Sequence, residues 1–237
     1  MEIFFVWIIS ISFTGNFFQQ NNFLNNIKEE ILHKTLKLFL KHGIREMSNQ
    51  KLVDQLGIST KTVYKHFKNK EDLLEEVLYL YHDQQYEMLK NLGQGQNAAC
   101  LFFDVWQMAI ETEYKINKNF YEDLHYYYPE LERKVNAFIG KKFERFFLSI
   151  IYRGIEQGTF QKYILPEAAL KSVLVLLKAA VRTNEFKSFH LSANDLLLNT
   201  IAFYIRGLCT DQGLQAFDQH IVNRQFDERL AEMKNFQ

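Results

Sequence analysis

The sequence has few residues of the types that break or cross-link a chain. It contains only two prolines in 237 residues, so few positions interrupt a helix. Its two cysteines, Cys100 and Cys209, are too few for a disulfide framework and lack the CxxC spacing of a redox or zinc site. These shortages favour an all-α fold whose two thiols lie buried in a reducing, cytoplasmic environment.

The chain also has no net charge, because 28 basic residues balance 28 acidic ones. The balance is not uniform along the chain. Residues 27–72 hold ten Lys or Arg against six Asp or Glu, a charge of +4, which leaves −4 for the remainder. The total charge therefore excludes no class of partner, whereas the basic segment needs an explanation of its own.

The apolar run at residues 3–13, IFFVWIISISF, has eleven residues, fewer than the roughly 20 that span a bilayer. It also lacks the basic start of a secretory signal. We expect residues 1–26 to form an N-terminal extension that is disordered or wrongly assigned to the protein. An added helix packed on the body and membrane association are the alternatives, and membrane association is the least favoured.

Apolar residues recur at helical spacing through the first part of the chain. They predict a first helix over 27–41, a second that is capped by Ser48 and ends at Gly57, and a third that begins at Ser59 or Thr60. A helix as short as the third is not stable alone. It must be docked on the other two.

Longer helices are predicted in the rest of the chain. A fourth begins at Asn69 or Lys70 and ends before the glycines of residues 93–97. No stretch alternates with the period of a strand, so the predicted fold is all-α, with a first domain at 27–74 and a second at 75–237. Four or five further helices are expected, at roughly 98–116, 118–127, 129–157, 166–182 and 192–208.

Two short helices joined by the GIS turn at residues 57–59 are typical of a helix-turn-helix, whose second helix enters the major groove of DNA. Val63 and Phe67 are spaced to hold that helix to its domain. For any single lysine on the outer face, a merely solvated side chain is the alternative. We expect base contacts from Thr60, Lys61, Thr62 and Lys65, and phosphate contacts from Tyr64, His66 and Lys70.

Residues 48–74, SNQKLVDQLGISTKTVYKHFKNKEDLL, resemble the DNA-binding domain of TetR-family transcriptional regulators. The resemblance also implies a place for Ser48, which opens the second helix, at the DNA. Val53 and Leu56 depart from the family, which often has Ala at these positions, and both enlarge the packing between the second and third helices. The shared features are Ser48, Gly57-Ile58-Ser59, Thr62-Val63-Tyr64, Phe67 and the run from Lys70 to Leu73.

The resemblance implies a ligand-responsive repressor that binds double-stranded DNA as a homodimer on a palindromic operator. Residues 166–181 and 196–208 are apolar nearly all round, so each helix must be covered on two sides. In the family, the last two long helices pair with those of a second subunit. We therefore expect the homodimer to form through residues 166–208, with a central helix of a monomer as the alternative.

Members of the resembled family bind a small effector in the C-terminal helical domain. Residues 98–128 are rich in aromatic side chains, which suit an apolar pocket, although aromatics at helical spacing are more often core. The effector itself is unknown. The candidate contacts are Trp106, Met108, Tyr114, Tyr127 and Phe147.

The sequence contains no GxSxG, HExxH, P-loop or GxGxxG motif, so we expect no enzyme, no catalytic residue and no cofactor. His125, His190 and His220 do not have the spacing of metal ligands with either cysteine, and no metal is expected. Two other classes stay open: an architectural DNA-binding protein without an effector, and a membrane-attached sensor.

Overall fold

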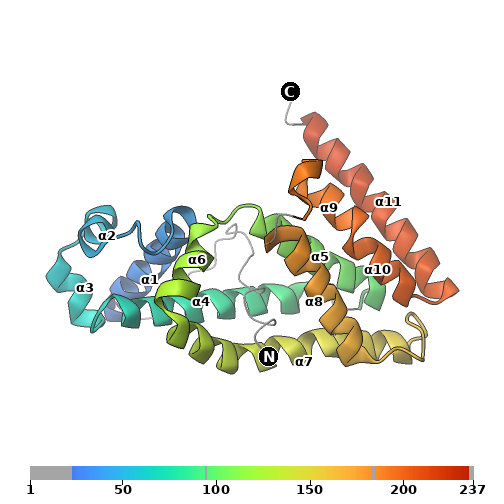
Figure 1. Ribbon diagram of the computed structural model, residues 1–237, viewed down its shortest axis with the longest axis horizontal. Helices are drawn as coiled ribbons and strands as arrows, with labels where there is room; N and C mark the ends of the chain where they lie inside the picture. Colours follow the sequence, from blue (N-terminus) through green and yellow to red (C-terminus); the bar gives the residue numbers. More distant parts are fainter. Residues whose placement is uncertain (1–22, 94, 183–184, 235–237) are drawn as a thin grey trace. The chain divides into compact units, whose positions relative to one another are not determined.

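The computed structural model describes residues 23–93, 95–182 and 185–234, and these residues confirm the all-α prediction (Figure 1). The only pairing of strand type among them is an isolated bridge between Phe160 and Cys209. The predicted extension at residues 1–26 lies almost wholly outside the described residues. No helix within the described ranges is long and apolar enough to cross a membrane.

The described residues form two compact units, one within residues 23–88 and 112–143 and the other within residues 89–111 and 144–234. The first unit therefore joins the predicted helix-turn-helix to a later segment of the chain, and the predicted boundary at residues 74 and 75 stays a prediction. Its helices are α1 (Phe23–His42), α2 (Asn49–Leu56), α3 (Thr60–His66), most of α4 (Lys70–Asn91), α6 (Asn119–Tyr127) and the first half of α7 (Pro129–Glu156).

The predicted ends of the second helix and the predicted start of the third are confirmed, whereas α1 begins at Phe23, four residues before the predicted start and inside the predicted extension. The side chain of Ser48 caps α2 by accepting a hydrogen bond from the backbone of Lys51 at 3.3 Å. The side chain of Ser59 caps α3 in the same way, accepting from the backbone of Thr62 at 3.1 Å. Gly57 ends α2 in the left-handed conformation, with φ of 69°, which glycine adopts without steric cost.

The second unit contains most of α5 (Ala98–Glu113), the end of α7, α8 (Pro166–Arg182), and the last three helices: α9 (Ala193–Asn199), α10 (Ile201–Leu208) and α11 (Asp211–Lys234). The helix predicted over 192–208 was wrong as a single element. The chain breaks at Thr200, whose hydroxyl donates to the carbonyl of Leu196 at 2.5 Å, a local bond that competes with the helical ladder. Helix α11 was not predicted.

Candidate nucleic-acid interface

Helix α3 buries one face and exposes the other. Val63 and Phe67 are each 1% exposed, and α3 packs against α2. The side chains of Thr60, Lys61 and Lys65 are exposed on the opposite side. Two apolar residues thus hold a short helix in place while its hydroxyl and ammonium groups face outward, as the sequence predicted for this face.

The remaining candidates on α3 are half-buried. The hydroxyl of Thr62 lies 2.8 Å from that of Ser59, so it belongs to the cap as well as to the outer face. Tyr64 is half-buried, which raises the pKa of its phenol. His66 lies beside Phe67, with the ring centroids 6.4 Å apart. Ser48, the cap of α2, is exposed.

Lys70 differs from the other candidates because its ammonium faces the protein. The nitrogen donates a hydrogen bond to the carbonyl oxygen of Ile44 at 2.6 Å and lies 5.7 Å from the centroid of the Phe39 ring. Burial lowers the pKa of Lys70, and the carboxylate of Asp123 acts in the opposite direction. The phosphate contact predicted for Lys70 stays a prediction, and its structural role is to tie α4 to the turn after α1.

The sequence that forms these helices matches a known family. Residues 31–77 match the model of the family described as "Bacterial regulatory proteins, tetR family". They form a TetR-type DNA-binding domain. The match begins inside α1 and ends inside α4, so it contains α3, its capping serine and both of the residues that hold it.

Two curated relatives share parts of the chain. The uncharacterised HTH-type transcriptional regulator YerO of Bacillus subtilis is 33% identical over 71 residues, which are 30% of this chain and 25% of that protein. The HTH-type transcriptional repressor KstR2 of Rhodococcus jostii is 20% identical over 163 residues, 65% of this chain and 78% of that one. The chain thus spans only a quarter of YerO but most of KstR2.

A solved structure extends the likeness beyond the TetR-type domain at the level of the fold. A candidate transcriptional regulator from Saccharomonospora viridis, in complex with choline, is 14% identical to this chain with a TM-score of 0.67. The likeness covers 78% of this chain and 99% of that one. The helices that follow the TetR-type domain therefore share the fold of that protein.

Helix α6 holds the turn between α1 and α2 of the TetR-type domain. Asp123 accepts a hydrogen bond from the backbone nitrogen of Arg45 at 2.8 Å. The Arg45 guanidinium donates to the Tyr127 hydroxyl at 2.6 Å and lies 4.4 Å from the centroid of that ring. Gly43 lies close to the same carboxylate, since a β-carbon at this position would come within 3.1 Å of Asp123. We call the four residues Gly43, Arg45, Asp123 and Tyr127 the turn clasp.

The turn clasp was not predicted, and Tyr127 was predicted as an effector contact. The only sequence signal was a glycine shortly after the helix predicted over 27–41, and this residue, Gly43, follows the end of α1 with φ of 87°. Nothing in the sequence indicated that Arg45 would find partners on α6, since Asp123 lies 78 residues away.

The five predicted effector contacts belong to two different units. Trp106 and Phe147 stack in the core of the second unit, with the ring centroids 4.9 Å apart, and they are 0% and 2% exposed. Met108 is half-buried on the same helix as Trp106. Tyr114 and Tyr127 belong to the first unit and are 50% and 53% exposed. An effector site built from all five stays a prediction.

No group of three or more His, Cys, Asp or Glu side chains in the described ranges could hold a metal ion. Cys100 and Cys209 are free and buried.

Proposed function

We propose that this chain is a sequence-specific DNA-binding repressor of the TetR type whose operator affinity changes when a small effector binds. One observation carries the proposal: α3 exposes Thr60, Lys61 and Lys65 while Val63 and Phe67 fix it from behind. Short hydroxyls and long ammonium groups on a braced helix can reach base edges in the major groove. The repressor assignment follows the name of the relative KstR2. The proposed target, DNA, implies a cytoplasmic protein.

Selection from a random duplex DNA library with the full-length protein tests this function. We expect one enriched sequence. Lys65→Gln should change which sequence is enriched, whereas Lys162→Gln, an exposed lysine in the second unit, should not. No enrichment by the wild-type protein, or equal profiles for all three proteins, would contradict the proposal.

We also propose that the protein acts as a homodimer through α8 and α10, which pack against each other. Val175 on α8 is 48% exposed and Phe203 on α10 is 63% exposed. Apolar side chains exposed on two neighbouring helices suit a self-complementary interface. A two-fold dimer would then select an inverted repeat, with half-site centres about 34–36 Å apart.

Sedimentation velocity tests the dimer. We expect the wild-type protein to sediment with twice the mass of the chain, and Val175→Glu with Phe203→Glu to sediment as a monomer, because each change places a charge in the interface. Val222→Glu is the matched control, since Val222 is 58% exposed on α11. A control variant that dissociates equally would argue against α8 and α10.

The turn clasp offers a route from an effector to α3. An effector that displaces α6 moves Asp123 and Tyr127, and both hold Arg45 in the turn that leads from α1 into α2. Coupling between the two sites needs only about 1–3 kcal/mol. We expect Asp123→Asn to weaken the effect of any effector on DNA binding more than it weakens DNA binding itself. An architectural protein without an effector would show no such response.

A further inference from the structure

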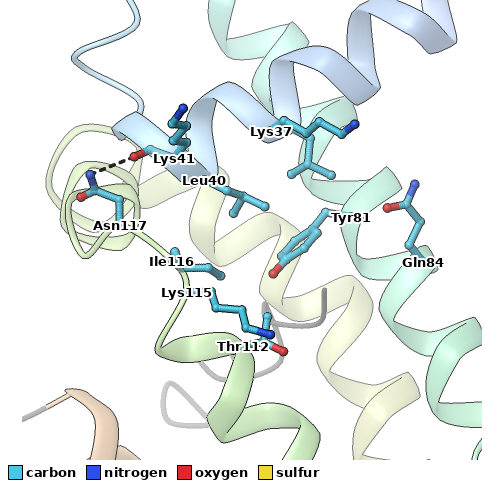
Figure 2. A pocket seen from close by; sticks show the side chains of 10 residues that line it. Lys37, Leu40, Lys41, Tyr81, Gln84, Thr112, Lys115, Ile116 and Asn117 are labelled. Atoms are coloured by element: carbon cyan, nitrogen blue, oxygen red, sulfur yellow. Dashed lines mark hydrogen bonds between the residues drawn. The ribbon is translucent and has the colours of Figure 1, made fainter. Parts of the chain in front are cut away.

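A pocket of about 590 Å³ lies in the first unit, between α1, α4 and the residues that lead from α5 into α6 (Figure 2). Leu36 and Leu40 of α1, Tyr81 of α4 and Ile116 of the connection are among the residues that line it. In Figure 2, Leu40, Ile116 and the Tyr81 ring lie around its centre. The volume is in the range of sites for small molecules, which run from about 300 to 1,000 Å³.

Three lysines border these apolar side chains. Lys37 and Lys41 extend from α1, and the Lys115 amine lies beside Thr112 (Figure 2). Neither Asp nor Glu occurs among the described residues that line the pocket. A pocket lined by apolar side chains and three lysines, but by no acidic residue among those described, favours a ligand with a negative head over a cation such as choline. In Figure 2 the Lys37 and Lys41 amines extend away from Leu40 and Tyr81, so these exposed side chains must rotate to reach such a head.

We propose that this pocket binds an anionic amphiphile, a molecule with one carboxylate or phosphate head on an apolar body. The apolar body would lie against Leu36, Leu40 and Ile116. Its head would lie at the lysines, whose long flexible stems let the ammonium groups reach it.

The pocket adjoins the turn clasp through Asn117. The Asn117 backbone donates to the carbonyl of Leu40 at 3.0 Å, and its side-chain amide donates to the carbonyl of Lys41 at 3.1 Å. The connection that lines the pocket is thus fastened to the end of α1 and leads directly into α6. If the proposed function holds, a ligand that moves this connection away from α1 changes the affinity for DNA through the turn clasp.

Calorimetric titration of the full-length protein tests the binding site directly. The probes share one alkyl chain and differ in the head: dodecanoate, dodecanol and dodecyltrimethylammonium, each below its micelle-forming concentration. We expect dodecanoate to bind at least about tenfold more tightly than the other two, because only its carboxylate accepts charged hydrogen bonds from the lysines. Equal binding of dodecanol and dodecanoate would overturn the proposal.

Substitutions test whether the probes bind in this pocket. The triple variant Lys37→Gln, Lys41→Gln, Lys115→Gln should lose at least about tenfold in dodecanoate affinity and leave dodecanol unchanged. Lys34→Gln is the matched control on α1, where Lys34 pairs with Glu30 outside the pocket. Ile116→Trp should fill the pocket and weaken both probes. Circular dichroism melting confirms that each variant is folded, and a control that loses as much affinity as the triple variant would overturn the site.

A second measurement separates this inference from the proposed function. DNA binding of each variant is followed by gel shift, with and without dodecanoate. Binding of dodecanoate without any DNA binding would leave the pocket assigned and contradict the regulator. DNA binding without any binding of dodecanoate would overturn the pocket and leave the regulator.

Discussion

The carboxylate of Asp104 in α5 accepts a hydrogen bond from Nε2 of His220 in α11, and the two atoms lie 2.7 Å apart. Gln96 donates a second bond to this carboxylate at 2.9 Å, and the Arg224 guanidinium lies 3.0 Å away. Burial raises the pKa of Asp104, but the hydrogen bonds from His220 and Gln96, together with the charges of Arg224 and His220, outweigh it and lower the pKa below its usual value. This cluster ties α11 to α5 within the second unit.

The lowered pKa predicts how the second unit responds to acid. A carboxyl group whose pKa is lower in the folded state than in the unfolded state stabilises the folded state. The contribution is complete at pH values above the unfolded-state pKa of about 3.9, and it is lost as the pH falls through the folded-state pKa. We expect Asp104→Asn to reduce the unfolding free energy by about 2 kcal/mol at neutral pH and by less in acid. Urea unfolding at several pH values measures this. Glu156→Gln, an exposed change on α7, is the control, and equal losses at all pH values would contradict the prediction.

A side chain at Gly43 should cost more stability than one at Gly57. Both glycines have positive φ, 87° and 69°, so alanine is strained by about 1–2 kcal/mol at either position. At Gly43 the added carbon would also meet Asn119 and Asp123 at 3.1 Å, whereas nothing lies within 4 Å at Gly57. We expect Gly43→Ala to cost about 1 kcal/mol more than Gly57→Ala in urea unfolding. Equal costs would show that α6 does not press on this turn.

Lys70→Met should destabilise the TetR-type domain. The change keeps the apolar stem but leaves the buried Ile44 carbonyl without its ammonium partner, a loss of about 1–3 kcal/mol. Lys68→Met, at an exposed position just before α4, should cost almost nothing. Chemical denaturation measures both. If Lys70 contributes only to DNA binding, the two variants will be equally stable. Lys70→Met will then differ from Lys68→Met only in the salt dependence of DNA binding.

Both thiols should be inert in the folded protein. Burial raises the pKa of Cys100 to about 11 and that of Cys209 to about 12. At pH 8, only about one Cys100 side chain in a thousand is then the reactive thiolate. We expect Ellman's reagent to modify neither cysteine until guanidinium unfolds the protein, after which both react. Rapid reaction of a folded Cys100→Ser or Cys209→Ser variant would identify an accessible thiol.

Features of the TetR-type domain that depend on near neighbours were predictable. The caps at Ser48 and Ser59 join groups three residues apart, and the buried face of α3 follows from the spacing of Val63 and Phe67. The break at Thr200 is also local, yet it was missed because the apolar pattern continues through it. The periodicity of apolar residues shows which face of a helix is buried. It does not detect a side-chain hydroxyl that donates a hydrogen bond to a backbone carbonyl of the helix.

The sequence by itself determined the helices of the first unit, the outward face of α3 and the likeness to TetR-family regulators, because these depend on groups within one or two turns of each other. Only the tertiary structure decided that Lys70 turns toward Ile44, that Asp123 holds Arg45, and that three lysines from two segments border one pocket. Their partners lie 26 to 78 residues apart. Contacts over such separations are set by how helices dock, which no spacing within a helix specifies.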